Sequence, residues 1–370
     1  MNTNKQLHQY LLSLRKADIQ DIAEIFDEKF PDSWIKERMA YRLAEIYERN
    51  PRTLLRAFSY PVVTFLRALF ERKLNGLWDA SIDSDPVFGD LTQFYDQLEF
   101  LSLIDYAEGK LIVPEFLSGV VSGSALAAPE ELEAWQEMEL CALGMLDVYG
   151  LIEERLFLQI FCGCFTGINE EQAVDFLTRR LEVRIMSYRV DFGNGVWWLS
   201  DLIDNPEEWY LMMHGRSRIE YRRYTKDEYI DFALYAFSQP PKNYERLFTI
   251  LRQAGVKSDE AESILEDAIM SQRCQLEPRL GVPDFIRDTS AVKSITEVQR
   301  VLDLYREFCN DIPLWLNKGH TPSELFHLSS GAARSGSTSP NGKRPGIRKQ
   351  SNIIAFPAGR ARSGKPKADK

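Results

Sequence analysis

The sequence predicts a mainly helical protein with one or two winged-helix-like modules that carry small β-hairpins. Apolar residues recur at spacings of three and four along much of the first 330 residues, which is the period of an amphipathic helix. Two Gly-containing turns, at 107–110 and 193–195, adjoin short β-rich runs. With 370 residues, 44% hydrophobic and 27% charged, the chain has the composition of a globular protein and the length of two or three domains.

Residues 1–50 are predicted to form a helical hairpin. Apolar residues keep helical spacing over 7–14, 19–26 and 35–46, and Ser33 can cap the last of these helices. The pattern resembles the SAP and Rho N-terminal domains, families that often contact nucleic acid. The resemblance implies that nucleic acid binds the basic residues of the polar face, which are Arg15, Lys16, Lys36, Arg38 and Arg42. A solvated face on a packing module is the alternative interpretation.

Residues 51–120 are predicted to form a first winged-helix-like module. Helical periodicity over 53–72 and 91–106 is followed by the turn at 107–110 and by an apolar run at 111–113 that favours a short strand. The helix expected at 91–106 carries acidic residues and no Lys or Arg, so a phosphate backbone would repel it.

Residues 130–212 are predicted to form a second winged-helix-like module. Its three expected helices are 131–148, 153–164 and 170–181. Tyr149-Gly150 breaks the first helix, and Asn169 with Gln172 is a capping signature for the third. Gly193-Asn194-Gly195 predicts a β-hairpin formed by 183–192 and 196–199. Acidic residues precede Arg179 and Arg180 in the third helix, which favours protein–protein contact over DNA recognition.

Residues 225–328 are predicted to form a helical domain, and 329–370 a disordered basic tail. Thr225-Lys-Asp-Glu228 is a capping box that starts the first helix of this domain, and Pro240-Pro241 stops it. Further helices are expected at 242–254, 258–272 and 291–309. Thr321-Pro-Ser-Glu324 places a cap, a first-turn proline and a reciprocal glutamate in order for one more short helix. The tail is rich in Gly, Ser, Pro, Arg and Lys and cannot bury enough apolar surface to fold.

Charge is divided unevenly along the chain. The whole chain carries a formal net charge of −10, whereas residues 331–370 contain ten Lys or Arg and one acid, a net of +9. The first 330 residues therefore carry −19, which disfavours general nucleic-acid binding by that part. The tail is the expected contact for an anionic surface such as nucleic acid, with Arg344, Arg348 and Lys349 as candidate binding residues.

The densest basic cluster of the first 330 residues lies at 216–226. Its candidate binding residues are Arg216, Arg218, Tyr221, Arg222, Arg223 and Tyr224. Arginine beside tyrosine suits phosphate contact and base stacking. The same residues suit docking against the protein's own acidic helices, and this second interpretation is preferred.

The chain shows no sequence pattern of a catalytic or metal site. It contains no P-loop, G-x-G-x-x-G, G-x-S-x-G or H-E-x-x-H motif and only four histidines. The five cysteines, at 141, 162, 164, 274 and 309, favour buried free thiols over a metal or redox site at Cys162-Gly-Cys164. We therefore predict no catalytic, cofactor-binding or metal-ligating residue and no enzymatic activity. A hydrolase or nuclease built from distant carboxylates remains the alternative.

The segment Asn310–Leu325 resembles a stretch found in bacterial proteins that often end in a SEC-C zinc motif. The matching positions are Asn310, Trp315, Gly319, Thr321, Pro322, Glu324 and Leu325. The preceding order, a SAP- or Rho-N-like start and helical blocks with a Tyr-Gly turn, is similar too. The resemblance implies an architecture and a bacterial setting rather than an activity. The zinc role is not carried over because no cysteine follows Cys309. Trp315 is expected to anchor the segment against the preceding helix.

These observations predict a non-catalytic binding or adaptor protein. A protein partner is expected, and nucleic acid is a second candidate partner, bound through the tail. A DNA-binding regulator is a further alternative, although it requires a basic recognition helix. No apolar run approaches the roughly 20 residues that span a bilayer, and residues 1–15 lack a signal-peptide core. We therefore expect a cytoplasmic location without membrane contact; the oligomeric state stays open.

Overall fold

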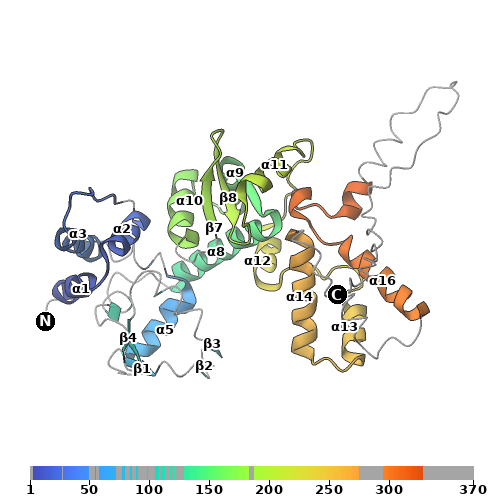
Figure 1. The fold of residues 1–370 in the computed structure, drawn as a ribbon, viewed down its shortest axis with the longest axis horizontal. Helices are drawn as coiled ribbons and strands as arrows, with labels where there is room; N and C mark the ends of the chain where they lie inside the picture. Colours follow the sequence, from blue (N-terminus) through green and yellow to red (C-terminus); the bar gives the residue numbers. More distant parts are fainter. Residues whose placement is uncertain are drawn as a thin grey trace, which may run out of the picture.

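The computed structural model shows a mainly helical chain with small antiparallel sheets (Figure 1). It describes residues 3–26, 28–49, 55, 58–71, 129–182, 187–274 and 295–327, together with short pieces between 77 and 121. Within this part of the chain, no helix is both long enough and apolar enough to cross a membrane. The predicted tail, residues 329–370, lies outside the described residues.

Three helices form the N-terminal unit, namely α1 (Thr3–Leu11), α2 (Lys16–Ile25) and α3 (Lys36–Arg49). Each contributes buried apolar residues, such as Leu11, Ile19 and Leu43, because side chains three and four positions apart share one face of a helix. The predicted hairpin is thus a set of three short helices around one core.

A small sheet accompanies helix α5 (Tyr60–Glu71) in the next part of the chain. Its strands are β1 (Leu77–Asp79), β4 (Asp105–Ala107) and β5 (Lys110–Ile112), in the order β1-β5-β4, and a separate ribbon pairs β2 (Ser84–Asp85) with β3 (Gly89–Asp90). The helix predicted at 91–106 is wrong at its end, because Asp105 and Tyr106 pair with Ile112 and Leu111 across the turn. Most of the first predicted winged-helix-like module lies outside the described residues.

The central unit combines three helices with a three-stranded antiparallel sheet. It contains α8 (Pro129–Tyr149), β6 (Leu151–Glu153), α9 (Glu154–Cys164), α10 (Glu170–Leu177), a π-helix (Thr178–Glu182), β7 (Ser187–Asp191) and β8 (Val196–Ser200). The sheet order is β6-β8-β7. The predicted hairpin is confirmed, and so is the capping box in which Asn169 and Gln172 exchange hydrogen bonds.

Strand β6 has no counterpart among the predicted elements. Gly150 adopts a φ of +66°, a left-handed conformation that ends α8 and turns the chain so that residues 151–153 pair with β8. Leu151 and Ile152 are both buried, so the strand lacks the alternation of apolar and polar residues by which half-buried strands are recognised.

Helix α12 (Lys226–Tyr235) packs closely along α8. A Cβ atom at Gly144 would lie 1.7 Å from the carbonyl oxygen of Tyr229, so the two helices can approach this closely only at a glycine. The capping box formed by Thr225 and Glu228 starts α12, as predicted, and the helix ends at Ala236, before Pro240. Helix α11 (Pro206–His214) connects the sheet to this region.

The C-terminal unit contains α13 (Tyr244–Gln253), α14 (Ser258–Cys274), α16 (Ile295–Cys309) and a 3-10 turn (Trp315–Asn317). These helices confirm the three predicted spans within the described residues. Leu247, Leu265 and Phe308 belong to the core of this unit, which is distinct from the larger core around α8. A third apolar cluster includes Leu151 and Trp315, which come from the sheet and from the 3-10 turn.

Candidate functional site

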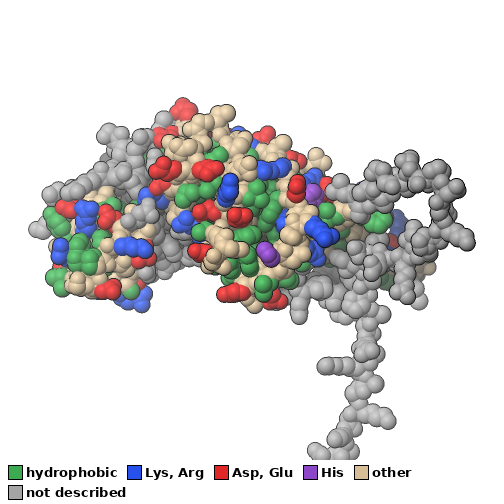
Figure 2. Space-filling model, turned by 90° about the horizontal axis from the view of Figure 1, so that it is seen from above, with side chains coloured by type: hydrophobic (Ala, Val, Ile, Leu, Met, Phe, Trp, Pro, Cys, Tyr) green, Lys and Arg blue, Asp and Glu red, His purple; other side chains and the backbone are tan. Residues whose placement is uncertain are grey.

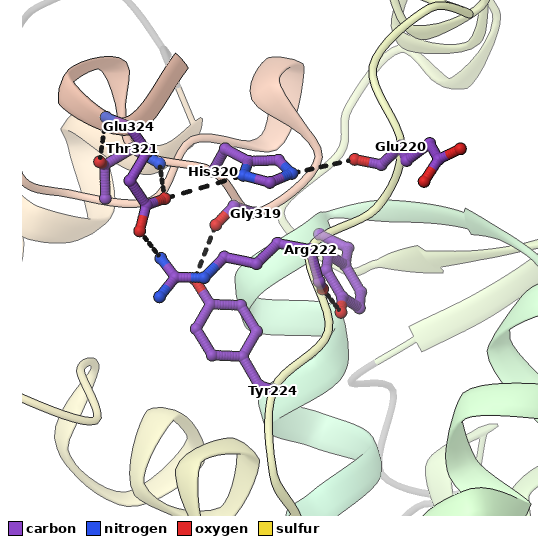
Figure 3. A network of polar contacts seen from close by, with 8 residues as sticks. Glu220, Arg222, Tyr224, Gly319, His320, Thr321 and Glu324 are labelled. Atoms are coloured by element: carbon purple, nitrogen blue, oxygen red, sulfur yellow. Dashed lines mark hydrogen bonds and ion pairs between the residues drawn. The ribbon is translucent and has the colours of Figure 1, made fainter. Parts of the chain in front are cut away.

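Residues 314–324, here called the docked segment, are tied to the stretch of chain between α11 and α12. The backbone N–H of Arg222 donates to the carbonyl of Lys318 at 3.0 Å, and the Tyr224 hydroxyl donates to the carbonyl of Gly319 at 2.6 Å (Figure 3). Lys318 and Gly319 both have positive φ values, 54° and 82°. This left-handed turn places its carbonyl groups against residues 222–224.

Glu324 holds the end of the docked segment. Its carboxylate accepts a hydrogen bond from the Thr321 backbone at 3.1 Å, and its own N–H donates to the Thr321 hydroxyl at 3.1 Å, so the predicted capping box is confirmed. The other carboxylate oxygen lies 2.6 Å from the Arg222 guanidinium. The two side chains are 32% and 37% exposed, so solvent screens the ion pair and it contributes under about 1 kcal/mol.

His320 lies beside this ion pair. Its Nδ1 is 3.7 Å from a Glu324 carboxylate oxygen, and its Nε2 is 3.1 Å from the backbone carbonyl of Glu220 (Figure 3). The imidazole therefore bridges the docked segment and the chain that follows α11. The ring makes both contacts within the protein, so its place in the structure is that of a linker between two chain segments.

Three tyrosines lie beneath the docked segment. The Tyr149 hydroxyl donates to the carbonyl of Arg222 and lies 2.6 Å from the Tyr229 hydroxyl, which accepts from the Tyr224 N–H at 3.2 Å. Burial raises the pKa of each of these tyrosines above its ordinary value. The hydroxyls therefore stay neutral and act as hydrogen-bond groups that align residues 222–229 with α8.

Two glycine–aromatic contacts join the docked segment to the end of α8. A Cβ atom at Gly150 would lie 2.2 Å from the Trp315 ring, and one at Gly319 would lie 2.8 Å from the Tyr149 ring. The Trp315 indole N–H also donates to the carbonyl of Asp147 at 2.7 Å. The expected anchoring of Trp315 against the preceding helix is therefore wrong. The ring packs on α8 instead, because Gly150 leaves room for a flat aromatic face there.

The candidate residues at 216–226 make several contacts within the protein. Arg216 donates to the Asn317 side chain at 2.8 Å and to the Leu316 carbonyl at 3.3 Å, and the Tyr221 hydroxyl donates to the Leu151 carbonyl at 2.9 Å. Arg222 and Tyr224 contact the docked segment as described above. The side chains of Arg218 and Arg223 are exposed. Arginine and tyrosine in this cluster thus connect segments of one chain.

The five N-terminal candidate residues lie at the surface of the three-helix unit, and most are engaged locally. Their contacts are Arg15 with Asp18 at 2.7 Å, Lys16 with the Asp32 carbonyl at 2.7 Å, Lys36 with the Leu14 carbonyl at 3.3 Å, and Arg42 with Glu28 at 3.0 Å and Glu45 at 3.3 Å. Hydrogen bonding to Arg15 lowers the pKa of the Asp18 carboxyl. Arg38 is exposed and lies 3.9 Å above the Trp34 ring, an arrangement that also suits a nucleobase.

The basic residues of α10 and the π-helix point to a structural role. Arg180 is fully buried and lies 3.1 Å from the buried carboxylate of Glu139, and Arg179 pairs with Asp175 at 2.6 Å. The burial of the Arg180–Glu139 pair was not predictable from the sequence, since the two residues come from separate helices. These arginines are thus engaged inside the protein rather than presented to a phosphate backbone.

A second buried charged group lies beside the docked segment. Arg273 is fully buried; it donates to the carbonyl of Ala236 and lies 5.3 Å from the Phe232 ring. Burial raises the pKa of the Asp147 carboxyl to about 6, and Arg273 partly opposes this. No spacing in the sequence distinguishes these two residues from surface charges.

Among the described residues, no three His, Cys, Asp or Glu side chains converge as metal ligands would. Arg344, Arg348 and Lys349 lie outside those residues. Comparisons of the chain with known protein families, with curated proteins and with solved structures found no match. The site therefore has to be interpreted from its own contacts, which are those of a segment-docking arrangement.

Proposed function

We propose that this is a non-catalytic binding or adaptor protein of the cytoplasm, which contacts a protein partner through its acidic folded part and nucleic acid through its basic tail. One observation carries the proposal. The cations of the folded part are largely engaged with the protein's own segments, as Arg216 and Arg222 are, whereas ten Lys or Arg gather in residues 331–370. An anionic partner would therefore be attracted mainly to the tail.

The distribution of charge on the folded part supports this division. On the face shown in Figure 2, Lys and Arg side chains are interspersed with Asp and Glu and form no continuous basic area. Extended phosphate backbones are bound by basic faces or stripes. The N-terminal pair Trp34 and Arg38 remains a second, smaller candidate contact for nucleic acid.

The central unit, residues 130–212, is proposed to be a winged-helix-like module that binds protein. Its order of helix, strand, helix, helix and hairpin and its sheet order β6-β8-β7 support the proposal. Its third helix begins with Glu170 and Glu171, and Arg180 behind them is buried. An acidic helix in the recognition position favours a protein partner over DNA. The resemblance to proteins that often carry a SEC-C motif belongs to the same proposal.

A binding measurement with labelled single-stranded RNA and duplex DNA tests the role of the tail. We compare the full chain with a variant in which the ten Lys and Arg of 331–370 are Gln, at several salt concentrations. The full chain should bind at low salt and lose affinity as salt rises, and the variant should bind at least tenfold more weakly. The slope of log K against log salt should fall by about 0.7–0.9 for each phosphate that the variant no longer neutralises.

The matched control is the double variant Arg218→Gln, Arg223→Gln, which removes two exposed cations from the folded part. Its affinity should stay within twofold of that of the unaltered chain. Equal, salt-insensitive binding by the tail variant and the unaltered chain would remove the tail from the proposal. A loss confined to the Arg218 and Arg223 control would move the contact to 216–226.

A further inference from the structure

Cys141 and Cys164 come together although they lie on different helices. Cys141 is fully buried in α8, and Cys164 is the partly buried last residue of α9. The Cys141 thiol donates a hydrogen bond to the Cys164 sulfur, and both cysteines are free. The fold therefore pairs Cys164 with a residue 23 positions away rather than with Cys162.

Lys226 places a positive charge beside this pair. Its ammonium lies 2.9 Å from the Glu137 carboxylate and 5.8 Å from the centre of the Phe165 ring. Glu137 is one helical turn before Cys141 on the same face of α8, and Phe165 directly follows Cys164. The close packing of α12 on α8 at Gly144 fixes this position, because Lys226 opens α12.

The two sulfurs have different electrostatic surroundings. The hydrogen bond from Cys141 lowers the pKa of the Cys164 thiol, and the nearby Lys226 and Arg223 lower it further, against the effect of burial. The same hydrogen bond, together with burial, raises the pKa of Cys141. Negative charge is thus favoured on Cys164, the sulfur nearer to solvent, while Cys141 keeps its proton.

We propose that Cys164 and Cys141 form a redox-active pair that a hydroperoxide converts into a disulfide. The Cys164 thiolate attacks one peroxide oxygen, the O–O bond breaks, and Cys164 becomes a sulfenic acid as hydroxide leaves. The Cys141 sulfur then attacks the Cys164 sulfur, the S–O bond breaks, and water leaves with the Cys141 proton. The two cysteines lose two electrons, and hydrogen peroxide is reduced to two molecules of water.

Cys162 offers a matched comparison within the same helix. It lies two residues before Cys164, so its side chain leaves α9 on a different face. Burial raises the pKa of its thiol, with Glu170 adding to the effect, and the hydrogen bond of Cys141 goes to Cys164. A Cys162→Ser variant therefore keeps the proposed pair intact while it removes the neighbouring thiol.

Peptide mapping of the reduced full-length chain after treatment with hydrogen peroxide and thiol blocking tests the proposal. Arg155 separates Cys141 from Cys164 for trypsin digestion, so the disulfide should appear as two linked peptides with the loss of two hydrogens. Cys162→Ser should give the same link. Cys164→Ser should abolish it and leave Cys141 reduced, whereas Cys141→Ala should leave Cys164 as a sulfenic or sulfinic acid.

The rate of disulfide formation tests the role of the cation. Lys226→Gln should slow the reaction several-fold at neutral pH, and Lys226→Arg should restore most of the rate, because the charge next to Cys164 returns. A link that forms equally well in Cys164→Ser, or that disappears only in Cys162→Ser, would overturn the proposal. So would a wild-type chain in which peroxide oxidises Cys164 to the sulfinic acid while Cys141 stays free.

Discussion

Two glycines carry the contact between the docked segment and α8. Gly150 faces the Trp315 ring, and Gly319 faces the Tyr149 ring, each at a distance that excludes a Cβ atom. Both glycines also have positive φ values, 66° and 82°. Each position therefore requires glycine twice, for its backbone conformation and for the aromatic ring that it meets.

Gly150→Ala is expected to lower the free energy of unfolding by about 3 kcal/mol, since the left-handed conformation and the collision with Trp315 add together. Gly167→Ala is the matched control: its φ is +86°, but its Cβ would meet nothing within 4 Å, so it should cost only about 1 kcal/mol. Urea unfolding of both variants measures the difference. Equal losses would show that Trp315 moves aside without cost.

Asp147 gives the protein a pH-dependent term in its stability. Burial, with a contribution from Asp201, raises the pKa of its carboxyl to about 6, above the value of about 4 in an unfolded chain. The folded state thus holds a proton that the unfolded state loses first. The contribution of Asp147 to stability is therefore most favourable below about pH 4, falls as pH rises to about 6 and is constant above that.

Asp147→Asn removes this pH-dependent term and keeps the backbone carbonyl that accepts from Trp315. The variant should match the unaltered chain at pH 4 and exceed its free energy of unfolding by up to about 2 kcal/mol at pH 7.5. Urea unfolding across that pH range measures the difference, with Asp204→Asn as a control for the loss of one negative charge. A less stable variant at pH 7.5 would mean that attraction to Arg273 outweighs the burial of the carboxylate.

At the scale of single elements, local chemistry made most helices of the described residues predictable. The capping boxes at Asn169, Thr225 and Thr321 act over four residues, so the sequence contains everything that defines them. Strand β6 was not predictable, because three residues are too few to show a period and because its pairing depends on β8, more than 40 positions later. The strand at Asp105–Ala107 was missed for the same reason.

The candidate site was less predictable than the helices. Arg216, Tyr221, Arg222 and Tyr224 were recognised as a cluster, yet their partners lie 70 to 102 positions away in the chain. Trp315 likewise finds its acceptor 168 positions earlier, at Asp147. Residue spacing predicts which side chains share a helical face, but it does not predict which segment will cover that face.

At the scale of the whole molecule, two apolar cores are connected through a smaller third one. The core around α8 and the core of α13, α14 and α16 are distinct clusters, and Trp315 lies in the cluster that also contains Leu151, from the sheet, and Cys274, from the end of α14. Cooperative unfolding of the two large cores therefore depends on the packing of this one fully buried indole.

Trp315→Ala is expected to uncouple the two large cores. Removing the ring should lower stability by about 3–5 kcal/mol and leave the carbonyl of Asp147 without its indole donor. Native-state hydrogen exchange should then give different opening free energies for α8 and α14, whereas the unaltered chain should give similar ones. Phe326→Ala is the control, because its ring is 54% exposed and its loss should change neither value. An equal fall in α8 and α14 would mean that the helices remain coupled without Trp315, through contacts such as the hydrogen bond from Arg273 to the Ala236 carbonyl.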